Sequence, residues 1–217
     1  MTDTRLERIA ESLAEGLREG IGQNGGRLFV ELKRLLANGR PVAREELARV
    51  LGFSRDELEE ALRSLPSVEY DGEGNVVGSG LTLNPTPHRF EVNGHEFFTW
   101  CALDTLFFPG ILEKAARVTS VCHATGEKIQ LTVAPEGVAD LEPAETVVSI
   151  VIPDSEQVCC DIRGAFCNDV HFFRSRDAAV DWHGKHEGAH VLSVSEAFSV
   201  GHRLCTLLFE GVLGRGE

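Results

Sequence analysis

A thiol and a carboxylate lie three residues apart within an almost wholly apolar stretch, residues 100–109. In a helix, Cys101 and Asp104 would share one face, about one turn apart. A carboxylate in apolar surroundings is costly unless it has a partner or a chemical task. Because desolvation raises a carboxyl pKa toward neutrality, the pair is suited to proton transfer. The alternative is structural: Asp104 would cap a backbone amide at the helix end, and Cys101 would pack as a small hydrophobe.

A second thiol, Cys167, lies in the run Gly-Ala-Phe-Cys-Asn-Asp-Val-His-Phe-Phe at residues 164–173. Together the two stretches resemble the organomercurial (alkylmercury) lyase family, in which Trp-Cys-Ala-x-Asp is followed much later by Phe-Cys-x-x-Val-His-Phe-Phe. Three further segments are similar to that family: Gly-Arg-Pro-Val at 39–42, Gly-Leu-Thr-Leu at 80–83 and Val-Cys-His-Ala-Thr-Gly at 121–126. The resemblance covers roughly residues 25–200.

The resemblance implies an enzyme that cleaves the carbon–mercury bond of alkyl- and arylmercury compounds by protonolysis, giving a hydrocarbon and Hg(II) for mercury detoxification. It implies that Cys101 and Cys167 bind mercury, and that Asp104 carries the proton and is a further candidate ligand. Some family members have a second cysteine after the later one; here that residue is Asn168, so it receives no role. Mercury would be substrate and product, no cofactor would be needed, and small thiols and a mercuric reductase would be partners.

Three other interpretations are consistent with the residues. A winged helix that carries soft-metal thiols would be typical of a metal-responsive regulator, which would bind DNA. A thiol hydrolase would use Cys101 as nucleophile and a histidine as base, and would not depend on Cys167. A structural zinc site would draw its ligands from Cys122, His123, Cys167 and His171.

Charge and composition exclude several classes of protein. The 217 residues carry a formal net charge of −13, which opposes binding to nucleic acid or to an anionic membrane. The first residues mix both charge signs without an apolar centre, so they predict no signal peptide. No run approaches the roughly 18 apolar residues of a membrane span. We therefore expect a cytoplasmic protein whose six cysteines are reduced thiols.

The other cysteines have simpler interpretations. Cys122 begins a turn and Cys205 lies on the apolar side of a helix, so both are predicted to be packed and inert. The vicinal pair Cys159 and Cys160 suits neither a zinc knuckle nor an easy disulfide. The pair would either be packed or serve to trap stray mercury or relay it outward.

The first 83 residues predict a winged-helix-like helical domain. Apolar periodicity and turn residues indicate helices at 4–19, 27–37, 44–51 and 54–65, with a break at the glycine-rich residues 20–26. A hairpin at 68–70 and 76–77 would form the wing. The helix after Ser54 would be the recognition helix, but it carries four carboxylates that phosphate would repel. We therefore interpret the unit as a packing domain.

Residues 84–217 predict a catalytic α+β domain with a mixed, mostly antiparallel sheet. Asn93-Gly94 is a strong hairpin signal between strands at 88–92 and 95–99. Further strands are expected at 117–121, 129–133, 147–152 and 170–173. Helices are expected at 100–108, 177–186 and 195–209, the first of them ending at Pro109-Gly110.

Overall fold

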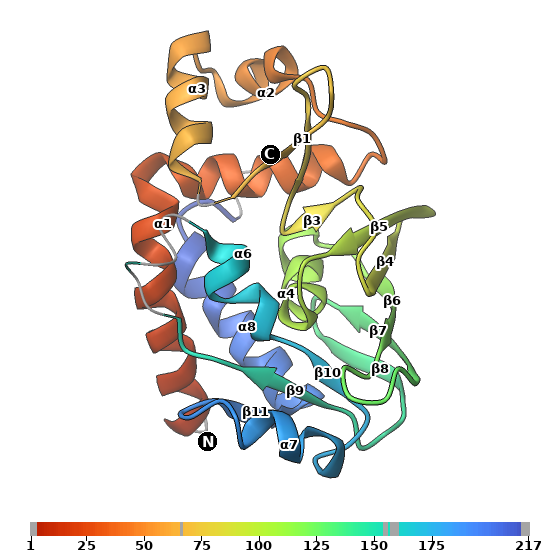
Figure 1. Cartoon of the computed structure of the whole chain (residues 1–217). Helices are drawn as coiled ribbons and strands as arrows, with labels where there is room; N and C mark the ends of the chain where they lie inside the picture. Colours follow the sequence, from red (N-terminus) through yellow and green to blue (C-terminus); the bar gives the residue numbers. More distant parts are fainter. Residues whose placement is uncertain (1–3, 66, 154–155, 157–160, 214–217) are drawn as a thin grey trace.

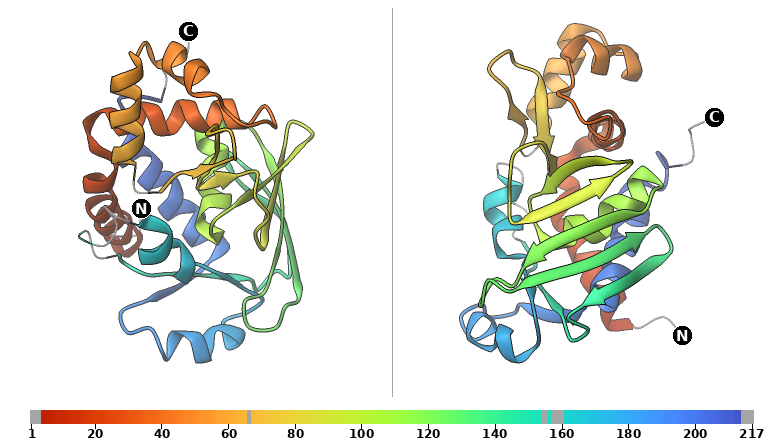
Figure 2. Two further views of the ribbon diagram at one scale, coloured as in Figure 1. Left: turned by 45° about the horizontal axis from the view of Figure 1, so that its top comes forward. Right: turned by 90° about the vertical axis from the view of Figure 1, so that its right-hand side faces the viewer.

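The computed structural model describes residues 4–65, 67–153, 156 and 161–213 (Figure 1). An eight-stranded sheet with the order β1-β2-β3-β5-β4-β6-β7-β8 forms one layer, and the long helices cover one of its faces (Figure 2). A second sheet has three strands in the order β10-β9-β11. The pairings are antiparallel in both sheets of the described part of the chain. The predicted α+β fold with a winged-helix-like N-terminal unit is confirmed.

The N-terminal helix is longer than the sequence predicted. α1 (Thr4–Leu36) runs through the glycine-rich residues at which we expected a break. Its axis turns sharply between its first and second halves (Figure 1). Glycine weakens a helix by roughly 1 kcal/mol relative to alanine but keeps its N–H group, and glycines are a common cause of kinks. Because Leu13 and Leu28, on either side of the bend, are fully buried, packing holds the chain helical.

The remaining N-terminal elements follow the predicted signals. α2 (Arg44–Leu51) ends at Gly52, whose φ of 71° is left-handed, and Ser54 and Glu57 form the expected capping box of α3 (Arg55–Ser64). β1 (Glu69–Tyr70) and β2 (Val76–Ser79) form the wing hairpin. This unit is built into the rest of the molecule, because β3 (Leu81–Thr82) pairs with β5 (His95–Thr99) as well as with β2, and α1 packs against α8 (Val194–Phe209).

The large sheet is built from hairpins. β4 (His88–Val92) and β5 (His95–Thr99) turn at Asn93 and Gly94, which have φ values of 54° and 78°, as the hairpin signal requires. β6 (Ala116–Val121) and β7 (Lys128–Ala134) were also predicted. The sequence missed β8 (Gly137–Glu142), because this edge strand is largely exposed and lacks the alternation of apolar residues that marks a half-buried strand.

The C-terminal elements are shorter than expected, apart from α8. β9 (Val147–Ile150) pairs with β10 (Phe172–Phe173) and with β11 (His190–Ser193), which was not predicted. The helix expected at 177–186 is a 3-10 turn, η2 (Asp177–Ala179), followed by the short α7 (Val180–His183). The segment that carries Cys167 consists of α6 (Ile162–Ala165) and the 3-10 turn η1 (Cys167–Asp169).

The helix that carries Asp104 also extends past its predicted end. α4 (Ala102–Leu112) continues through Pro109 and Gly110. A proline inside a helix costs about 3 kcal/mol, but Phe108 and Ile111 are fully buried, one on each side of it, and their burial outweighs that cost. None of the helices in the described residues combines the length and apolar character that crossing a membrane requires.

Candidate active site

Cys101 and Asp104 lie at the N-terminus of α4. Cys101 is the N-cap residue, with extended backbone angles of φ −144° and ψ 171°. Asp104 is in the first helical turn, and its Oδ2 accepts a hydrogen bond from the Cys101 N–H at 3.3 Å. The capping contact that we weighed as an alternative therefore exists, and it fixes the carboxylate beside the thiol. The positive end of the helix dipole also favours a thiolate at this position.

Backbone contacts bring the distant Cys167 segment to this helix end. The Ala102 N–H donates to the Val170 carbonyl at 3.1 Å. Ser149 of β9 clamps the same segment, because its Oγ donates to the Asp169 carbonyl at 2.9 Å and accepts from the His171 N–H at 2.8 Å. The turn η1 is thus held against both α4 and the small sheet.

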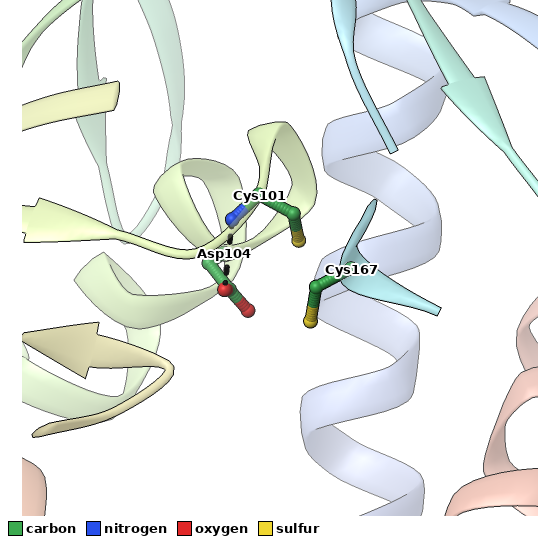
Figure 3. A group of neighbouring side chains, drawn as sticks. All are labelled: Cys101, Asp104 and Cys167. Carbon is green, nitrogen blue, oxygen red and sulfur yellow. Dashed lines mark hydrogen bonds between the residues drawn. The ribbon is translucent and has the colours of Figure 1, made fainter. Parts of the chain in front are cut away.

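The three predicted residues converge in space. One ligating atom from each of Cys101, Asp104 and Cys167 lies within 4.8 Å of the others. Figure 3 shows both thiols and the carboxylate directed toward the same space. Cys101 is fully buried and Cys167 is 4% exposed. The sequence placed these residues on two motifs far apart in the chain, and the structure assembles them into one cluster.

Burial sets the protonation of this cluster. Desolvation raises the pKa of Asp104 to about 6, although the hydrogen bond from the Cys101 thiol and the charge of Lys33 oppose the rise. Desolvation, with the hydrogen bond to Cys167 and the charge of Asp104, raises the pKa of Cys101 well above its ordinary value. The hydrogen bond from Cys101 lowers the pKa of Cys167, but desolvation and Asp104 raise it more, so it ends above its ordinary value. Asp104 can therefore exchange a proton near neutral pH.

A cavity of about 60 Å³ adjoins the cluster. Asp104 and Cys167 contribute to its wall, and much of the rest is apolar, including Phe29, Phe107 and Phe209. This volume exceeds that of one water molecule. The cavity can therefore hold a small apolar group next to the thiols and keep bulk water away from them.

The described residues do not form the alternative zinc site or the cysteine–histidine pair of a thiol hydrolase. His171 stacks on His123 with ring centroids 3.8 Å apart, whereas Cys167 faces Cys101. In the described part of the chain, the one cluster of three metal-ligating side chains is Cys101, Asp104 and Cys167. This cluster contains no imidazole, whereas a thiol hydrolase would need a histidine beside its cysteine. Cys159 and Cys160 lie outside the described residues.

Sequence reasoning missed three charged neighbours of the site. Lys33 of α1 is fully buried, and its Nζ lies 3.3 Å from the centroid of the Phe29 ring. Glu69 of β1 and Arg163 of α6 form an ion pair with 2.6 Å between Oε1 and Nη1. The motifs gave no signal for these contacts, because Glu69 and Arg163 are 94 residues apart.

Known proteins share both the sequence and the fold. The alkylmercury lyase family matches residues 81–206, and the helix-turn-helix domain of alkylmercury lyase matches residues 7–80. An alkylmercury lyase of Pseudomonas putida is 48% identical over 204 residues, 94% of this chain and 93% of that protein. One from Streptomyces lividans is 47% identical over 211 residues, 96% of each chain. The crystal structure of the mercury-bound form of MerB2 aligns with a TM-score of 0.73 at 25% identity, covering 95% of this chain and all of that one.

The fold and the buried pair of thiols with a carboxylate define a class: an α+β protein with a buried thiol cluster that could hold a soft metal ion. The matches to the catalytic and helix-turn-helix regions extend over most of the chain, and nothing among them favours a regulator. The chain belongs to the alkylmercury lyase family, whose members are enzymes that cleave the carbon–mercury bond.

Proposed function

We propose that Cys101, Cys167 and Asp104 carry out protonolysis of the carbon–mercury bond in this chain. The observation that carries the proposal is their convergence within 4.8 Å beside an apolar cavity. Mercury(II) is a soft cation, and thiolate is the softest ligand that a protein offers. The cavity suits the organic group of an alkyl- or arylmercury compound, and the two thiols suit its metal.

The first step exchanges the ligand on mercury. The substrate is R–Hg–SR′, in which SR′ comes from a small thiol. One cysteine thiol forms a sulfur–mercury bond, the Hg–SR′ bond breaks, and the thiol proton moves to the departing R′S⁻ to give R′SH. We assign this step to Cys167, because the hydrogen bond between the two thiols favours the thiolate of Cys167 over that of Cys101. The result is R–Hg bonded to Cys167.

The second step breaks the carbon–mercury bond. Cys101 binds mercury as a further thiolate ligand and pushes electron density toward carbon, while Asp104 takes the Cys101 proton. Even a free thiol, with a pKa near ~8.5, is only a few per cent ionised at neutral pH, and burial raises the pKa of Cys101 well above its ordinary value, so a local base speeds this step. Asp104 then gives the proton to carbon as the bond electrons move onto it. Hydrocarbon RH leaves, and Hg(II) stays bound to two cysteines.

This scheme sets the requirements for cofactors and partners. The two thiol protons balance the reaction, one going to R′SH and one to RH, so it needs no organic cofactor and no resident metal. Small thiols deliver the substrate and compete for the bound Hg(II), and a mercuric reductase is the proposed final acceptor. We place the reaction in the cytoplasm, where glutathione keeps cysteines reduced; the four cysteines in the described residues are free thiols.

Phenylmercury with excess small thiol is the direct test, with benzene as the measured product. We expect Cys101→Ala and Cys167→Ala each to abolish benzene release, because each removes one of two required ligands. Cys205→Ala is the control, since Cys205 is also buried but lies on α8, and burial raises its pKa to about 11. A Cys167→Ala protein that turned over at the parental rate would disprove the two-thiolate mechanism.

A further inference from the structure

Four hydrogen-bond donors converge on the carboxylate of Glu69. Its Oε1 accepts from Arg163 Nη1 at 2.6 Å and from Trp100 Nε1 at 3.1 Å. Its Oε2 accepts from Thr82 Oγ1 and from Asn84 Nδ2 at 3.0 Å. The side chain is only 19% exposed. Charge-assisted hydrogen bonds of this kind are stronger than neutral ones and fix their partners in orientation.

Two of these donors lie just before the catalytic thiols. Trp100 directly precedes Cys101, and Arg163 precedes Cys167 by one helical turn in the sequence. The Arg163 guanidinium also lies 5.3 Å from the centroid of the Trp100 ring, within the range of a cation–π contact. Carboxylate, guanidinium and indole thus link the segment that leads into Cys101 with the segment that leads into Cys167.

The local backbone supports the same arrangement. A Cβ atom at Gly78 of β2 would lie 2.5 Å from Glu69 Oε2 and 2.5 Å from Thr82 Oγ1, so only glycine leaves room for the carboxylate. A second link runs in parallel, because Ser67 Oγ donates to Asp161 Oδ1 at 3.3 Å, and the same Oδ1 accepts from the Gly164 N–H at the start of α6 at 3.0 Å.

We propose that Glu69 is a positioning residue of the active site: acting through Arg163 and Trp100, it makes the N-terminal wing hairpin set the separation of the two thiols. This inference rests on the proposed function and gives the winged-helix-like unit a task in catalysis. A displacement of about 1 Å at reacting groups can cost roughly 10²-fold in rate. The ion pair is therefore worth more to the reaction than to stability, since pairs near the surface contribute only about 0–1 kcal/mol.

The test compares Glu69→Gln, Arg163→Gln and the double variant in the full chain. Three quantities are measured well below the melting temperature: kcat and KM for benzene release from phenylmercury, retention of Hg(II) against a competing small dithiol, and the melting temperature itself. We expect Glu69→Gln to lower kcat at least tenfold and to weaken Hg(II) retention. Because the two residues act as a unit, we expect the double variant to be no worse than the worse single variant.

Glu46→Gln provides the matched control. Glu46 pairs with Arg40 at 2.7 Å, its side chain is also 19% exposed, and Arg40 is 54% exposed against 43% for Arg163. Both pairs involve the N-terminal unit, but the Glu46 pair touches neither thiol segment. We expect Glu46→Gln to change the melting temperature about as much as Glu69→Gln does, with kcat and Hg(II) retention unchanged.

The outcomes separate this inference from the proposed function. A parental protein that releases no benzene would contradict the function itself. If the parent is active, parental kcat and Hg(II) retention in Glu69→Gln would overturn the positioning role, and so would fully additive losses in the double variant. If Glu69→Gln does not fold, Arg163→Gln decides the question alone, because its side chain is 43% exposed and the same losses are expected from it.

Discussion

At the scale of single residues, the position of Asp104 is compatible with both roles that the sequence presented as alternatives, helix capping and proton transfer. Its Oδ2 accepts the Cys101 N–H, as a capping residue would, and its carboxylate also lies beside both thiols. The roles are compatible, because an ionised carboxylate has two oxygens and about four acceptor sites. Substitution by asparagine can separate them, since an amide can still cap the helix but cannot carry the proton.

We expect Asp104→Asn to bind Hg(II) through the two cysteines and to fail in releasing hydrocarbon. General acid–base catalysis supplies about 10²–10⁴-fold, which is roughly 3–5 kcal/mol of barrier. Benzene release from phenylmercury should therefore fall by that factor, with unchanged Hg(II) stoichiometry. Near-normal release by a well-folded asparagine variant would remove Asp104 from the mechanism.

The same variant should be more stable than the parent near neutral pH. Desolvation raises the pKa of Asp104 from its ordinary value of 3.8 to about 6. The contribution of Asp104 to the stability of the parent therefore falls as the pH rises from about 4 to about 6, because the unfolded chain loses this proton first. Asparagine has no charge to bury, so its advantage in melting temperature should grow between pH 4 and 6 and stay constant above. A difference in melting temperature that stayed constant between pH 4 and 6 would show that the pKa of Asp104 is not raised.

Lys33 is a second buried ionisable residue, and its Nζ has no hydrogen-bond partner among the described residues. Desolvation lowers its pKa well below the ordinary value, and the charge of Asp104 only partly opposes this. We expect Lys33→Met to raise the free energy of unfolding at pH 6 by about 1–3 kcal/mol, since a buried unpaired polar group costs that much. The cation–π contact between its Nζ and the Phe29 ring offsets part of the cost in the parent.

The lowered pKa of Lys33 also determines how the stability difference between the parent and Lys33→Met changes with pH. As the pH rises from the folded pKa toward the unfolded value near 10.5, the parent gains stability, because only the unfolded chain still holds the proton. The advantage of Lys33→Met in urea unfolding should therefore shrink on the alkaline side. A methionine variant that is less stable than the parent at pH 6 would mean that the ammonium group has a stabilising role.

At the scale of elements, the sequence predicted the features that depend on adjacent residues, but not those that depend on contacts between residues far apart in the chain. The Asn93-Gly94 turn and the capping box at Ser54 depend on a few adjacent residues, and both formed where predicted. The predicted break in α1 and the predicted end of α4 were wrong, because burial against distant elements outweighed the glycine and proline signals. The thiol pair was found through two motifs, whereas Glu69 gave no such signal because its partners are 13 to 94 residues away.

Gly80 gives a test of how closely the hairpin region packs on α4. Its φ is 78°, and a Cβ there would lie 2.7 Å from the ring of Phe108. Gly80 also accepts the Trp100 N–H on its carbonyl at 2.9 Å. We expect Gly80→Ala to lower the free energy of unfolding by about 1–3 kcal/mol through backbone strain and overpacking. Gly94→Ala is the control for strain alone, since its φ is also 78° and nothing lies within 4 Å; equal losses would rule out the contact with Phe108.

At the scale of the whole molecule, the N-terminal unit has the shape of a DNA-binding domain without its charge. The chain carries a net charge of −13. Asp56, Glu57 and Glu60 of α3 are exposed, on the helix that would enter the major groove. The unit is also tied to the region of the candidate site, because α1 packs on α8 and α4 and Leu17 and Ile21 of α1 line the cavity beside the thiols. These contacts favour a role in building the active site.

We therefore expect the full-length protein not to bind random duplex DNA at 150 mM salt. Non-specific binders reach roughly 10⁻⁴–10⁻⁶ M by neutralising phosphates with basic side chains, and the carboxylates of α3 would repel phosphates instead. A fluorescence anisotropy titration with labelled duplex should show no saturable change up to about 10⁻⁴ M protein. The double variant Asp56→Lys, Glu60→Lys is the matched control, because both side chains are exposed and outside the capping box, and it should gain measurable binding. Micromolar binding by the parent would contradict the packing role and revive the metal-responsive regulator.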